Sequence, residues 1–127
     1  MEDPFIFRNH RGHFILMFHQ SHWGPGWNGA KAWSEDGITF HWSDNSMSRA
    51  WSSQINYTDG SSIVFRRREE PKIYTEGGQM LAMFNAVQGP SGGTYVMSQA
   101  LRSNQRHPHW QLGLAEVTRL APCVCGG

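Results

Sequence analysis

The chain has 127 residues, which is enough for one domain of ordinary size, and a formal net charge of +1 with neutral histidines. This balance of charge argues against nucleic acid as the main partner, because no broad basic field is present to attract a polyanion. Six Trp, seven Phe and three Tyr form a heavy aromatic load, which suits a β protein that stacks its rings against a flat or apolar ligand such as a sugar.

The sequence carries no sign of a membrane segment. No stretch approaches the length of a membrane-spanning helix, and no positively charged leader followed by an apolar segment marks a signal peptide. We therefore expect no membrane partner, and the localisation stays open.

Strand patterns dominate the first third of the chain. Four segments predict one antiparallel sheet: residues 4–8, 13–19, 30–34 and 38–42. The second segment is apolar on both faces, which is typical of a sheet packed between neighbouring sheets. The Asp36-Gly37 pair is a hairpin signal and joins the last two predicted strands.

A second sheet is predicted further along the chain, from residues 63–67, 71–74, 79–87 and 94–101. Residues 43–62 between the two sheets are polar and turn-rich, so no strand is expected there. Beyond the second sheet the alternation stops, and we expect an irregular tail over residues 103–127 with a short helix at 112–120. Cys123 and Cys125 in this tail lie too close in sequence for a relaxed disulfide.

The most informative feature is a repeat. Glu2-Asp3-Pro4 and Glu69-Glu70-Pro71 each precede a short strand, a glycine-containing turn and an apolar strand. Repeated spacing of this kind indicates a modular β architecture. It also places carboxylates at equivalent corners of successive modules, where they can converge on one site.

These motifs, together with Ala32-Trp33-Ser34-Glu35-Asp36-Gly37, resemble the five-bladed β-propeller glycoside hydrolases, the relatives of arabinanases, xylosidases and invertases in families 43 and 32. The resemblance covers residues 2–101. It implies an all-β fold of about two four-stranded propeller blades, at 2–62 and 63–102, followed by the irregular tail. It also implies that the Ser34 to Gly37 turn is structural, as in the Asp-box turns of other propellers.

The resemblance further implies catalytic residues. Asp3 fits the aspartate of the family's second blade, and Glu69 fits the general acid of the third blade because it lies two residues before Pro71. Glu70 remains an alternative to Glu69. Without the resemblance, each residue has a simpler structural role. Asp3 would cap the turn before Pro4, and Glu69 would be a solvated side chain at a strand end. The first-blade carboxylate has no counterpart, so we expect little or no hydrolysis by this chain alone.

Aromatic and basic residues near these corners are candidates for substrate binding. Trp23 and Trp27 lie in or beside a long loop, where they either stack on sugar or fill the space between blades, whereas Trp33 is expected in the core. Arg67 orients Glu69, binds a sugar hydroxyl or lies on the surface.

Histidines occur at two His-x-x-His spacings, formed by His10, His13, His19 and His22. This spacing suits a metal site on a helix, but these pairs fall on strand ends and turns. We therefore predict no metal and no cofactor.

The resemblance as a whole implies a glycoside hydrolase-like protein, a truncated catalytic domain whose partner is an oligosaccharide or polysaccharide. The alternatives are a carbohydrate-binding module without catalysis and an inactive propeller fragment. Because propellers protect their strand edges by closing the ring, we expect a two-blade chain to self-associate through its open edges.

Overall fold

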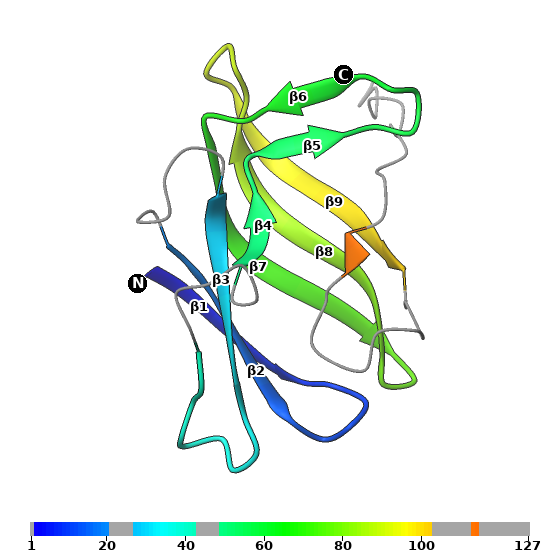
Figure 1. Cartoon of the computed structure of the whole chain (residues 1–127). Coiled ribbons are helices and arrows are strands. Elements are labelled where there is room, and N and C mark those ends of the chain that lie inside the picture. The colour runs from blue at the N-terminus through cyan, green and yellow to red at the C-terminus, as the bar shows by residue number, and fades with distance from the viewer. Residues whose placement is uncertain (1, 21–26, 43–48, 103–112, 115–127) are drawn as a thin grey trace, which may run out of the picture.

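The computed structural model describes residues 2–20, 27–42, 49–102 and 113–114. All regular elements among these residues are β-strands (Figure 1): β1 (Glu2–Arg8), β2 (Phe14–His19), β3 (Trp27–Ser34), β4 (Arg49–Ser52), β5 (Gln54–Asn56), β6 (Ser62–Val64), β7 (Arg67–Glu76), β8 (Gln79–Gln88), β9 (Thr94–Arg102) and β10 (Gly113–Leu114). The all-β prediction is therefore confirmed over this part of the chain, which also contains no helix of the length and apolarity needed to cross a membrane.

Three antiparallel sheets make up the fold. The N-terminal sheet has the order β1-β2-β3-β4, the C-terminal sheet has the order β7-β8-β9-β10, and β5 and β6 form a separate hairpin. Both large sheets are meanders in which each strand pairs with its neighbour in sequence, as is common for consecutive strands. Neither sheet closes on itself within the described residues.

The fourth strand of the N-terminal sheet is not the predicted one. Residues 38–42 contribute only an isolated bridge between Trp33 and His41, and the place beside β3 is taken by β4. The physical reason lies in the preceding turn. The Asp36 carboxylate accepts hydrogen bonds from the backbone N–H groups of Ile38 and Thr39, each at 2.8 Å, so these groups are turned toward the carboxylate and the start of the expected strand is lost.

Three further predictions were wrong. The strand expected over residues 63–67 in the second sheet is replaced by the shorter β6, which pairs with β5 in the separate hairpin, and the second sheet begins with β7. The segment 43–62, expected to lack strands, contains β4 and β5, whose apolar members Trp51 and Ile55 are buried. Within the helix expected at 112–120, residues 113–114 instead extend the C-terminal sheet beside β9, and the rest of that segment and both cysteines lie outside the described residues. The strands predicted at 4–8, 13–19, 71–74, 79–87 and 94–101 are confirmed, with small shifts at their ends.

The two large sheets pack face to face. Ile15 and Met17 of the N-terminal sheet share a buried cluster with Ile73, Met83 and Leu101 of the C-terminal sheet. A second cluster lies under the β5–β6 hairpin and includes Ile55, Phe65, Val87 and Met97. Of the described strands, β1, β2 and β3 all contact β7 (Figure 1), so the start of β7 lies beside the first sheet.

Candidate functional site

The two acidic corners adopt the same unusual backbone. Asp3 and Glu70, each directly before its proline, have φ angles of 54° and 49°, a left-handed conformation that is uncommon outside glycine. The strand register also shifts in each corner, between Glu2 and Phe5 and between Glu69 and Lys72. Bulges of this kind re-aim side chains, so the repeat seen in the sequence is also a repeat in conformation.

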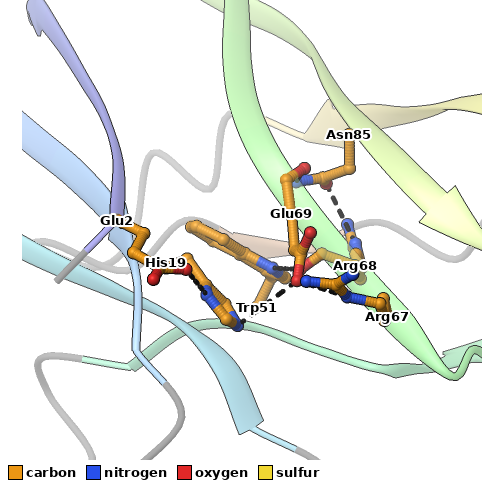
Figure 2. A network of polar contacts seen from close by, with 7 residues as sticks. All are labelled: Glu2, His19, Trp51, Arg67, Arg68, Glu69 and Asn85. Carbon is orange, nitrogen blue, oxygen red and sulfur yellow. Dashed lines mark hydrogen bonds and ion pairs between the residues drawn. The ribbon is translucent and has the colours of Figure 1, made fainter.

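The side chains brought together at these corners are Glu2, His19 and Glu69 (Figure 2). His19 Nδ1 lies 3.6 Å from Glu2 Oε2, and His19 Nε2 lies 4.0 Å from Glu69 Oε1. The His19 and Glu69 side chains are only 14% and 20% exposed, whereas that of Glu2 is 73% exposed. We refer to these three residues as the carboxylate–histidine cluster.

Strand register explains why this histidine faces the second sheet. Glu2, His19, Gly29 and Trp51 are paired in turn across the four strands of the N-terminal sheet. Residues that lie directly opposite on neighbouring strands share a face of the sheet. Trp51 belongs to the cluster buried between the sheets, so this row faces the C-terminal sheet.

Gly29 is required in this row because of the tryptophan beside it. A Cβ at Gly29 would lie 1.9 Å from ring carbons of Trp51, far inside any real contact, so only glycine lets the indole lie flat on the strand. The indole is fully buried, and its Nε1 donates a hydrogen bond of 3.0 Å to the backbone oxygen of Arg68. This hydrogen bond therefore links Trp51 of the N-terminal sheet to Arg68 of the C-terminal sheet, the residue directly before Glu69.

A buried polar network holds the same segment from the other side (Figure 2). Arg68 is fully buried and donates to Asn85 Oδ1, to the backbone oxygen of Ser52 and to Gln99 Oε1. All three acceptors are neutral, and burial lowers the pKa of Arg68 to about 9. Asn85 in turn donates to the backbone oxygen of Glu69, so the main chain on both sides of the Arg68–Glu69 peptide is fixed.

The residues predicted for the site fall in different places. Arg67 donates from Nε to Glu69 Oε1 at 2.8 Å, which is a charge-assisted contact, and its side chain is 63% exposed. Asp3 lies at the first corner, with no hydrogen bond or ion pair to another described residue. Trp23 lies outside the described residues, and for Trp27 only the backbone is described, paired with Ser52 at the start of β3.

Sequence reasoning missed two members of the cluster, Glu2 and His19. Glu2 could have been found by aligning the repeat, since Glu2 and Glu69 both lie two residues before the corner proline. His19 was weighed only as half of a metal pair, and its pairing with Glu2 across β1 and β2 follows from register. Trp33, expected in the core, is confirmed as half-buried and packed against the main cluster.

The cluster offers acid–base chemistry and hydrogen bonding. Two carboxylates on either side of an imidazole can bind hydroxyl groups, and side chains of both types serve as general acids and bases in enzymes. No group of three or more His, Cys, Asp or Glu side chains that could hold a metal ion occurs in the described part of the chain.

Comparisons with known protein families, curated proteins and solved structures find no match to this chain.

Proposed function

We propose that the protein is a glycoside hydrolase-like protein that binds an oligosaccharide at the carboxylate–histidine cluster. The observation that carries this proposal is that Glu2 and Glu69, from equivalent corners of two packed sheets, both contact His19. Glycoside hydrolysis uses a pair of carboxyl groups on either side of the scissile bond. The stacked sheets are then two neighbouring blades of a propeller, as the resemblance implies.

Within this proposal Glu69 is the better defined member of the pair. Its side chain is largely buried, Arg67 holds one oxygen, and Asn85 fixes its backbone. Precise positioning of this kind is what a reacting or substrate-binding carboxylate needs. The second carboxylate comes from the first corner and is either Asp3, favoured by the resemblance, or Glu2, favoured by its contact with His19.

The test is oligosaccharide binding, measured by calorimetry against a panel of neutral glycans, with hydrolysis of aryl glycosides as a second readout. We expect Glu69→Gln to weaken binding about tenfold or more, because hydrogen bonds to charged groups contribute about 1.5–3 kcal/mol. Asp3→Asn and Glu2→Gln are tested in parallel to identify the second carboxylate. The substitution that weakens glycan binding marks the residue that acts together with Glu69. A chain that binds no glycan of the panel, or binds equally well without these carboxylates, would disprove the proposal.

Binding that depends on the aromatic rings and not on the carboxylates would favour the carbohydrate-binding alternative, with or without hydrolysis. In that case Trp27→Ala should weaken the binding more than Glu69→Gln does, because aromatic stacking rather than the carboxylates would hold the sugar. The same calorimetric titration therefore separates the two functions.

A further inference from the structure

The C-terminal sheet leaves one face open to solvent. Its described members on this side alternate with the buried residues: Tyr74, Ala82, Phe84, Ala86, Val96 and Ala100 are apolar or aromatic, and Lys72 and Ser98 lie among them. Tyr74 is 52% exposed and Val96 71% exposed. We call this surface the C-terminal outer face. Contiguous exposed apolar surface of this kind marks a site of protein association.

The repeat identifies the surface to which this face corresponds. Counted from the corner prolines, Phe7 and Tyr74 are both the third residue, and they pair with Ile15 and Ala82. Ile15 is buried in the contact between the two sheets, and Phe7 packs against the same cluster. The C-terminal outer face is thus the counterpart of the surface with which the N-terminal sheet binds the C-terminal sheet.

The opposite pair of surfaces shows the same correspondence. Ile73 and Met83 form the side of the C-terminal sheet that is buried against the N-terminal sheet. Their counterparts in the first module, two and twelve residues after the corner proline, are Ile6 and Leu16, which pair with each other in the same register. Ile6 is 53% exposed, so this apolar side of the N-terminal sheet reaches solvent at β1.

On β2 and β3 this side is covered by other residues of the chain. Phe18 is buried on it together with Ala30 and Ala32, and Leu16 and Phe40 pack against them. Trp42 meets the Phe18 ring edge-on at 6.1 Å and is 52% exposed. We call the surface around Ile6, Leu16, Phe40 and Trp42 the N-terminal outer face.

We propose that a second copy of this chain stacks head to tail on the first, with the N-terminal outer face of one copy against the C-terminal outer face of the other. The contact would bring Ile6 and Leu16, the counterparts of Ile73 and Met83, against Tyr74 and Ala82, the counterparts of Phe7 and Ile15. It is heterologous, because different surfaces of the two copies meet, so it can continue into a ring or an open stack. This association uses sheet faces rather than strand edges and does not depend on the proposed glycan site.

The test is sedimentation velocity of the 127-residue chain over a concentration series. Tyr74→Lys places a charge on the C-terminal outer face, and Ile6→Lys does so on the N-terminal outer face. Val64→Lys is the matched control, because Val64 is also apolar and 55% exposed but lies on β6, outside both faces. We expect the unchanged chain and the Val64 variant to associate with rising concentration, and each face variant to stay monomeric.

The decisive sample is an equimolar mixture of the two face variants. Each retains the surface that the other has lost, so the mixture should form a two-copy species and nothing larger. The proposal is overturned if the unchanged chain stays monomeric at every concentration. It is also overturned if either face variant associates with itself, because such association requires a symmetric contact between two identical surfaces. Circular dichroism checks that each variant is folded, and Val96→Lys replaces Tyr74→Lys if the latter is not.

Discussion

The close approach of Gly29 and Trp51 gives a sharp prediction for Gly29→Ala. The new Cβ would lie 1.9 Å from two ring carbons of Trp51, whereas carbon atoms in contact rest about 3.5–4.0 Å apart. The fully buried indole must therefore move by about 1.5 Å. Such a shift breaks the 3.0 Å hydrogen bond from its Nε1 to the Arg68 backbone oxygen.

The expected cost follows from these two effects. Overpacking in a filled core costs about 1–3 kcal/mol, and the lost hydrogen bond costs about 1 kcal/mol. The lower entropy of the unfolded chain with alanine returns about 0.4–1 kcal/mol. We therefore expect Gly29→Ala to lower the free energy of unfolding by about 2–3 kcal/mol, measured by urea denaturation with far-ultraviolet circular dichroism.

Gly93→Ala is the matched control, because no atom lies within 4 Å of its new Cβ and Gly93 is not among the positive-φ glycines. We expect it to change stability by no more than about 0.5 kcal/mol. Equal stability of the Gly29 and Gly93 variants would refute the reasoning. A second check combines Gly29→Ala with Trp51→Leu. Because leucine removes the ring that the new Cβ would meet, Trp51→Leu should lower the free energy of unfolding by at least about 1 kcal/mol less in the Gly29→Ala variant than in the unchanged chain.

Three further predictions concern the polar groups of the fold. Asn85→Ala should lower the free energy of unfolding by about 3 kcal/mol, because it leaves the buried Arg68 guanidinium without one acceptor; an urea titration that shows less than about 1 kcal/mol would contradict this network. Burial lowers the pKa of Lys31 to about 8, so the unfolded chain binds more protons than the folded chain between pH 8 and about 10.4. The contribution of Lys31 to the free energy of unfolding should therefore rise with pH across that window. Lys31→Met should remove this rise when both proteins are denatured with urea at several pH values. The same dependence of stability on pH in both proteins would contradict the prediction. Hydrogen bonds from Thr39 and Ile38 to the Asp36 carboxylate hold the pKa of Asp36 well below its usual range, so Asp36→Ala should lower the melting temperature at neutral pH, and the difference should narrow as the pH falls below about 4; a difference that does not change with pH would rule out the carboxylate as its source.

The strands and the repeat could be predicted from the sequence because their signals are local. Alternation of apolar residues placed β1, β2, β8 and β9 within a few residues of their observed ends. The Asp36-Gly37 turn was also recognised, but its effect was not, since the acceptance of two backbone N–H groups by one carboxylate competes with strand pairing in a way that residue patterns do not express. As a result, β4 and not the segment 38–42 pairs with β3.

The sequence by itself determined the β class of the described residues, the two acidic corners and the choice of Glu69 and Arg67 as neighbours, since these depend on spacing along one chain. Only the tertiary structure brought Glu2, His19 and Glu69 together. The physical reason is that this cluster depends on how one sheet lies against another. That arrangement is decided by buried contacts such as the indole of Trp51 resting on Gly29, between residues that are far apart in the sequence or carry no pattern of their own.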